Sequence, residues 1–198
     1  MADEVSLVER KQRRARRRII EAADELFARH GFDGVSVSDI AERAEVGRTS
    51  FFRYFGDKQE VVFAREHEVL ALVAAEDVPE PVTDPSDLSG ALSALEPVVL
   101  RITARMAEDA EGFRRHLRLV EAHAELRERN AAKLQVIAER LGDLLTARGW
   151  DASASVFAAQ LAVACFWAAR RTAADPDALV EATRRAFDQA LTLGALRA

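Results

Sequence analysis

The sequence predicts an all-α protein, and both its composition and its hydrophobic spacing lead to that fold class. The 198 residues include only 9 Gly and 5 Pro, while the helix-favouring residues Ala, Leu, Arg and Glu are abundant. Apolar residues recur every three or four positions along most of the chain, as they do on one face of a helix. A β-rich fold would need more turn residues and more β-branched runs, so we expect helices throughout.

The first predicted helix covers residues 10–30, and Gly31 is expected to end it. Its apolar face has the spacing of a helix that packs on a core. It begins with a run of seven basic residues and no acidic one, at 10–18. The residues that form the apolar face are Ile19, Ile20, Ala23, Leu26 and Phe27.

Two short helices are predicted next, at 37–44 and 48–54, with a tight connection between them. Ser36 is a candidate N-cap for the first of them, and Asp39 stands where a capping box would place its acid. Asp57 is expected to cap a further helix that runs on to about residue 73. Two short helices behind a basic helix suggest a helix-turn-helix.

A break at 76–86, rich in Pro and acidic residues, precedes the remaining helices. Pro97 is expected to kink or restart the first of these helices. Gly149 and the sequence DPDA at 175–178 mark later helix ends. We therefore place an N-terminal domain at 1–56 and a larger helical domain at 57–198. The remaining helices are expected at 86–107, 109–147, 151–174 and 177–195.

Cysteine content and hydropathy favour a cytoplasmic protein. Cys165 is the only cysteine, which excludes an internal disulfide and a cysteine-based metal site and suits a reducing compartment. No apolar stretch follows the basic N-terminal run, so no signal peptide is predicted. The apolar stretch at 156–169 is too short to span a bilayer and contains Gln160, so no membrane segment is predicted.

The second short helix has two faces. Phe51 and Phe55 are four residues apart and are expected to point inward, while Arg48, Thr49 and Arg53 fall on the opposite side. In a major groove, Arg can pair with guanine and Thr can meet a thymine methyl group. The predicted DNA-binding residues are Ser38, Arg48, Thr49, Ser50, Arg53, Tyr54 and Lys58, the last two near phosphates.

The basic run at 10–18 has two interpretations, a DNA-backbone contact or a solvated helix end. We favour the backbone contact, through Arg13, Arg14 and Arg17, because the run directly precedes the first helix of the motif. The net charge of −5 argues against bulk affinity for nucleic acid, so any such affinity must be local.

The segment RRIIEAADELFARHGFDGVSVSDIAERAEVGRTSFFRYFGDKQEVV, residues 17–62, resembles the DNA-binding domain of TetR-family transcriptional regulators. The resemblance implies a homodimer that binds a palindromic operator, most often as a repressor. It also implies a C-terminal domain that binds a small molecule and dimerises through its last two helices. Glu45, Gly47 and Phe52 depart from the family pattern, which often has Gly, Ser or Thr, and a phosphate-binding Tyr there.

The effector pocket is expected among apolar and polar side chains of the C-terminal helices. Each of these residues could equally be plain core or solvated surface. No His pair has the spacing of a helical zinc site, and no cofactor fingerprint or nucleophile–base motif is present, so we predict no metal, no cofactor and no enzyme. The candidate pocket residues are Met106, Phe113, Leu117, Val120, His123, Phe166, Trp167 and Arg170.

Two other functions remain open at this point. A non-specific architectural DNA binder would lose affinity steeply with salt and show little preference between sequences. A helical ligand-binding protein or enzyme would bind a ligand tightly and lack operator readout.

Overall fold

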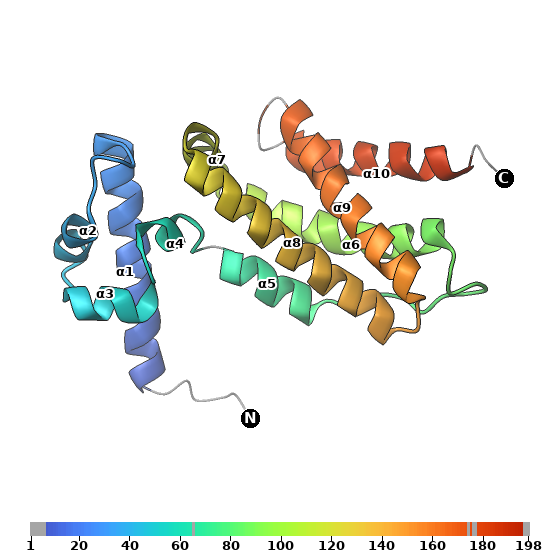
Figure 1. Ribbon diagram of the computed structural model, residues 1–198, viewed down its shortest axis with the longest axis horizontal. Helices are drawn as coiled ribbons and strands as arrows, with labels where there is room; N and C mark the ends of the chain where they lie inside the picture. Colours follow the sequence, from blue (N-terminus) through green and yellow to red (C-terminus); the bar gives the residue numbers. More distant parts are fainter. Residues whose placement is uncertain (1–6, 65, 174, 176–177, 196–198) are drawn as a thin grey trace. The chain divides into compact units, whose positions relative to one another are not determined.

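The computed structural model describes residues 7–64, 66–173, 175 and 178–195, and every regular element in these ranges is an α-helix (Figure 1). The predicted all-α fold class is confirmed. In chain order the helices are α1 Leu7–His30, α2 Val37–Arg43, α3 Arg48–Tyr54, α4 Lys58–Val62, α5 Glu66–Ala75, α6 Leu88–Ala107, α7 Ala110–Ala122, α8 Ala124–Ala147, α9 Ala152–Thr172 and α10 Leu179–Ala195.

The chain divides into two compact units, Met1–His67 and Glu68–Ala198. The sequence places the boundary between α3 and α4, at 56/57, whereas the compact units divide after α4. The reason is that α4 packs on α1, as α2 also does, and α3 packs on α2. The N-terminal unit is therefore a four-helix arrangement, and each unit is described by itself below.

Local signals in the sequence set the helix ends of the N-terminal unit. Gly31 has φ of 73°, a left-handed conformation that ends α1 and that favours glycine. Ser36 forms the predicted capping box, because its hydroxyl accepts from the Asp39 N–H and the Asp39 carboxylate accepts from the Ser36 N–H. Asp57 caps α4 by accepting from the backbone N–H of Glu60.

Two predicted continuous helices are broken in the structure. The range 57–73 is divided into α4 and α5, with Phe63 and Ala64 buried in the turn that follows α4. The range 109–147 is divided into α7 and α8 at His123, which adopts an extended backbone conformation. Neither break contains Gly or Pro, so neither carries the residue types that mark helix ends. Pro97, by contrast, lies inside α6.

The core of the C-terminal unit forms where α9 packs against α6, α8 and α10, and α10 also packs on α6. Small residues of α9 face this core and allow the helices to approach closely: Ala154, Ala158, Ala159 and Ala162. Larger side chains fill the remaining space, among them Leu95, Leu141, Leu145, Trp150 and Phe187. A helix with an alanine face needs bulky neighbours to reach native packing density, and these residues provide them.

Helix α9 is long and apolar enough, by length and composition alone, to cross a membrane. The predicted stretch at 156–169 is too short for this, but the helix that contains it has 21 residues. Its packing against α6, α8 and α10 accounts for its apolar character, because a core helix of this kind passes the same test of length and composition.

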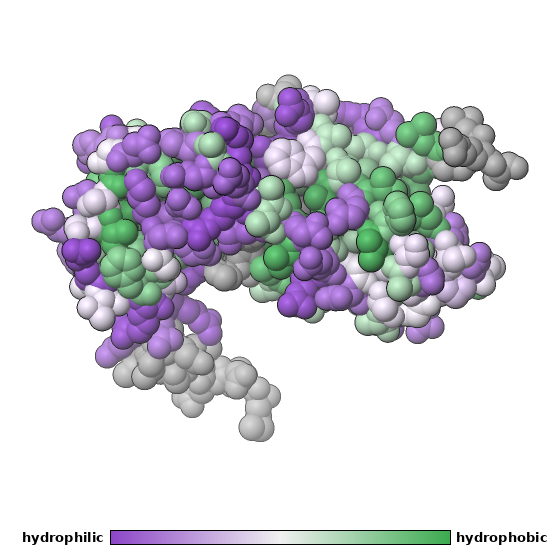
Figure 2. All heavy atoms as spheres, in the orientation of Figure 1, coloured by the Kyte–Doolittle hydropathy of each residue, from purple (hydrophilic) through white to green (hydrophobic). Residues whose placement is uncertain are grey.

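Part of α9 nevertheless remains at the surface. Val156 and Phe157 are exposed, the latter by 61%, and so is Leu193 of α10. In Figure 2, hydrophobic side chains gather at the surface over α9 and α10. The C-terminal unit thus carries apolar surface that its own helices do not cover.

Candidate nucleic-acid interface and effector site

Helix α3 has one buried and one exposed face, as predicted. Phe51 and Phe55 are buried, with their rings 5.9 Å apart, and they anchor α3 in the core of the N-terminal unit. Arg48, Thr49 and Arg53 are exposed on the other side. Gly47 is the N-cap of α3 and makes no side-chain cap hydrogen bond. This face can present hydrogen-bond donors to the groove of a duplex.

The side chain of Arg53 lies along the helix. It donates to the hydroxyls of Ser50 and Tyr54, each at 3.5 Å, and its guanidinium lies 5.2 Å from the centroid of the Tyr54 ring. Both hydrogen bonds are long and exposed, so Arg53 can leave them for a stronger acceptor. Ser50 and Tyr54 are half-buried, and Ser38 of α2 is exposed.

Lys58, which is predicted to contact a phosphate, already makes hydrogen bonds within the N-terminal unit. Its Nζ donates to the carbonyl oxygens of Phe32, at 2.9 Å, and Val35, at 3.2 Å, and lies 4.2 Å from the centroid of the Phe32 ring. These contacts join α4 to the loop between α1 and α2. An ammonium has three N–H donors, so a phosphate contact would use the third.

The basic run of α1 is a mixture of exposed and structural residues. Arg13, Arg14 and Arg17 are exposed, and Arg17 pairs with Glu21 one turn along the helix. Arg16, in contrast, donates to the carbonyl oxygen of Ala64 at 2.7 Å, with its guanidinium 5.2 Å from the Phe55 ring centroid. The segment is helical, so any backbone contact would be made from a helix face.

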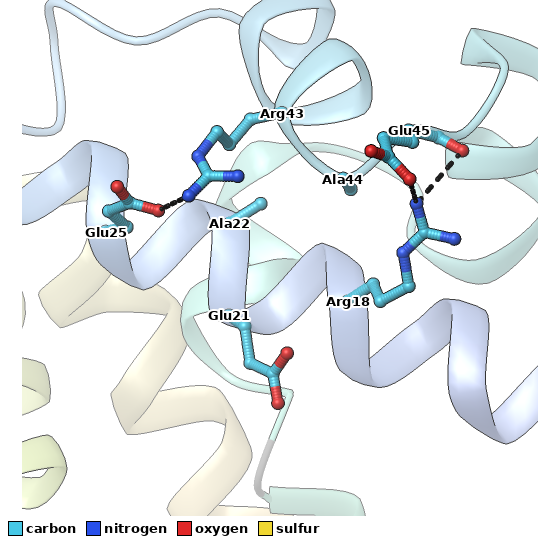
Figure 3. A pocket seen from close by; sticks show the side chains of 7 residues that line it. All are labelled: Arg18, Glu21, Ala22, Glu25, Arg43, Ala44 and Glu45. Atoms are coloured by element: carbon cyan, nitrogen blue, oxygen red, sulfur yellow. Dashed lines mark hydrogen bonds and ion pairs between the residues drawn. The ribbon is translucent and has the colours of Figure 1, made fainter.

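A surface hollow between α1 and α2 is lined by charged pairs (Figure 3). Arg18 donates to the carboxylate of Glu45 and, at 3.4 Å, to its backbone carbonyl oxygen. Arg43 pairs with Glu25 across the same hollow. Because opposite charges already meet here, the hollow holds α1 against the turn that precedes α3 and offers no unpaired charge to a ligand.

The predicted pocket residues of the C-terminal unit come together only in part. Phe113 of α7 forms a small apolar cluster with Ala169, Leu179 and Ala182, and partly buried Met106, Leu117 and Phe166 pack against it. Val120 is buried. His123 lies at the break between α7 and α8, with its Nδ1 2.9 Å from the carbonyl oxygen of Leu119.

Arg170 is the most unusual charged residue of this region. Its side chain is only 8% exposed, and its guanidinium lies 4.2 Å from the centroid of the Trp167 ring. It donates to Glu121 of α7 at 3.5 Å, a long bond to a mostly exposed carboxylate. Burial lowers the pKa of Arg170, and the attraction of Glu121 only partly offsets this. A partly compensated cation thus lies beside an apolar cluster.

Other chemistry is limited in the described residues. No group of His, Cys, Asp and Glu side chains within them is arranged to hold a metal ion. Cys165 is buried, and burial raises the pKa of its thiol, which makes it less reactive.

Comparison with known proteins identifies the family. Residues 19–64 match the sequence pattern of bacterial regulatory proteins of the TetR family. The chain is 32% identical to the HTH-type transcriptional regulator TcmR of Streptomyces glaucescens, over 93% of this chain and 84% of that protein. It is also 32% identical to the HTH-type transcriptional repressor SCO4008 of Streptomyces coelicolor, over 66% of this chain and 73% of that protein.

Solved structures agree on the fold. The complex of SmeT with triclosan aligns with a TM-score of 0.60 and 21% identity, over 90% of each chain. The chain belongs to the TetR family of DNA-binding transcriptional regulators, with an N-terminal helix-turn-helix domain and a C-terminal helical domain. Proteins of this family are not enzymes.

Several residues that shape the site were not predicted from the sequence. In the sequence Arg16 and Arg18 belong to one basic run. In the structure Arg16 bonds to Ala64 after α4, and Arg18 bonds to Glu45 before α3, so both hold α1 to other segments. For Arg16 and Arg18 a signal exists, because their positions fall near the apolar face of α1.

Proposed function

We propose that this protein is a repressor that binds a palindromic operator as a homodimer and is released by a small-molecule effector in the C-terminal domain. The single observation that carries the DNA-reading part is the exposed face of α3, with Arg48, Thr49 and Arg53. Ser38, Ser50, Tyr54 and Lys58 are proposed to border the contact, and Arg13, Arg14 and Arg17 to meet the DNA backbone.

The proposal of a dimer rests on uncovered apolar surface. Exposed Val156 and Phe157 of α9 and Leu193 of α10 lie on the two helices that the family resemblance assigns to dimerisation. Burying large apolar side chains against a second copy of the chain stabilises association. Two copies of α3 would then reach half-sites about 34–36 Å apart, one turn of the duplex.

Small-molecule release is supported by two relatives of known structure and by Arg170. SmeT was solved with triclosan, and a TetR-family repressor of Thermus thermophilus with lauroyl-CoA. In this chain we propose that the effector lies near Phe113, Phe166 and Trp167. Arg170 suits an acidic group on that effector, because a buried cation with one long bond to Glu121 gains most from a closer anion. Because regulators of this family act on DNA in the cytoplasm, we expect this protein to act there too.

The experiment that tests this function is selection of bound DNA from a random duplex library at near-physiological salt. A recovered palindrome would support a dimeric, sequence-reading repressor. Arg48→Ala should then relax the preference at one operator position, by about 1–3 kcal/mol. Equal retention of all sequences, with affinity that falls steeply with salt, would instead indicate a non-specific binder and overturn the proposal.

A further inference from the structure

Helix α3 carries an exposed aromatic side chain that the polar reading face does not explain. Phe52 is 48% exposed, whereas Phe51 on the same short helix and Phe55, the residue that follows its last turn, are buried. The Phe52 ring meets the Phe51 ring edge to face, with centroids 5.6 Å apart. Part of the Phe52 side chain therefore packs against a core residue, while about half of it is exposed to solvent.

The fold of the N-terminal unit does not require this ring. The anchoring role in α3 belongs to the buried rings of Phe51 and Phe55. Leaving about half of a phenyl ring in water forgoes apolar burial, at roughly 25 cal/mol for each Å² that stays wet. Hydrophobic side chains reach the surface over α3 and are bordered by hydrophilic ones (Figure 2). A partner that covers Phe52 would recover this energy.

The position of Phe52 determines what that partner is. It lies one turn after Arg48 and Thr49, and residues three and four apart are neighbours on a helix surface. If α3 enters a major groove, Phe52 enters with them. A phenyl ring cannot donate a hydrogen bond to a phosphate, and the apolar group on the floor of the major groove is the 5-methyl group of thymine.

We propose that Phe52 is a specificity-determining residue that selects a thymine in each operator half-site through its 5-methyl group. This inference rests on the proposed function, since it requires a sequence-specific operator. Phe52 would recognise an A·T pair by apolar contact, because a phenyl ring cannot make the hydrogen bonds that we expect of Arg48 and Thr49. It also accounts for a ring at a position where a hydroxyl would otherwise suit a phosphate.

The test replaces thymine by deoxyuridine, one position at a time, in the operator recovered by selection. This change removes one methyl group and keeps all hydrogen bonds of the base pair. For the full-length protein, a substitution in one half-site should weaken binding about fourfold, the value of one buried methyl-sized group, and the symmetric substitution in both half-sites about 15-fold. The same substitution should have no effect on Phe52→Ala, while Phe52→Tyr, which keeps the ring, should still respond to it.

Each other outcome counts against the inference. If every deoxyuridine operator binds as tightly as the parent, no methyl group is read. If the weakening persists in Phe52→Ala, another residue reads the methyl group. If Phe52→Ala weakens binding to all sequences equally, the ring contacts the sugar–phosphate backbone. Failure to recover any operator would overturn the proposed function itself, which is a separate result obtained before deoxyuridine is used.

Discussion

Different kinds of interaction stabilise the interiors of the two units of this protein. In the N-terminal unit, charged and polar side chains fix short helices: Ser36 and Asp57 cap, Lys58 and Arg16 donate to backbone carbonyl oxygens, and Arg18 holds Glu45. In the C-terminal unit, longer helices meet through apolar faces, where the alanines of α9 pack against larger residues of α6, α8 and α10.

The difference matters for function because the two units face different demands. Helix α3, which we propose reads DNA, has only seven residues and cannot be stable alone, so its orientation has to be fixed by specific bonds. The C-terminal unit, which we propose binds an effector, would need a core that can repack, and apolar contacts are less directional than hydrogen bonds. We therefore expect polar substitutions to matter most in the first unit and changes of side-chain volume to matter most in the second.

The largest effect is expected in the C-terminal core. Phe187 of α10 is fully buried, so Phe187→Ala should lower the free energy of unfolding by about 3–5 kcal/mol through lost burial and the cavity it leaves. Urea unfolding followed by circular dichroism measures it. Val82→Ala, a truncation on the same unit at an exposed position outside the proposed dimer surface, is the control and should change stability little. A loss below about 1 kcal/mol for Phe187→Ala would contradict a packing-dominated unit.

The next effect tests the polar bonds of the N-terminal unit. Lys58→Met keeps an apolar stem and removes the donor to the Phe32 and Val35 carbonyl oxygens, so it should cost about 2 kcal/mol of stability. Lys11→Met, at an exposed position of α1, is the control for loss of a charge.

The salt dependence of DNA binding separates the two roles of Lys58. If Lys58 also meets a phosphate, the magnitude of the slope of log K against log salt should fall in Lys58→Met by about 0.9 for each contact, or about 1.8 for the homodimer. An unchanged slope together with lost stability would assign Lys58 to positioning alone. Unchanged stability would show that its bonds to the loop are dispensable and would weaken the contrast between the units.

A smaller effect is expected at the capping box. Ser36→Ala should cost about 1 kcal/mol, because the first turn of α2 loses its cap.

The hydrogen bonds from Ser36 hold the pKa of Asp39 below its usual range. The folded state thus binds its proton less readily than the unfolded chain. This part of the stability is present above about pH 4 and is lost as the pH falls through the folded-state value. Asp39→Asn should unfold with a flatter pH dependence between pH 5 and 3, and an identical profile would refute the linkage.

These local signals also explain how much of the molecule could be predicted. Gly31, Ser36 and Asp57 are residue types that mark helix ends by themselves, so the order of elements in the N-terminal unit follows from them. His123 carries no such signal, and its break depends on how α7 and α8 pack. Trp167 lies one turn before Arg170 on α9, so periodicity brings these two together. Glu121 lies 49 residues before Arg170 on another helix, and periodicity cannot predict that pairing. The faces of α3 were predictable because four-residue spacing alone decides them.

The smallest effect, and the one whose sign is most informative, is at Glu45. This residue has φ of 52°, a left-handed conformation that costs a residue with a side chain about 1 kcal/mol relative to glycine. Its carboxylate, however, accepts from Arg18, and an exposed pair of this kind contributes less than about 1 kcal/mol. Glu45→Gly should therefore stabilise the protein by about 0.5 kcal/mol, whereas Glu45→Ala keeps the strain, loses the pair and should destabilise it. Thermal unfolding of both variants decides the matter. If Glu45→Gly is the less stable protein, the bond from Arg18 outweighs the backbone strain, and a charged pair at the surface, rather than backbone conformation, holds the turn before α3.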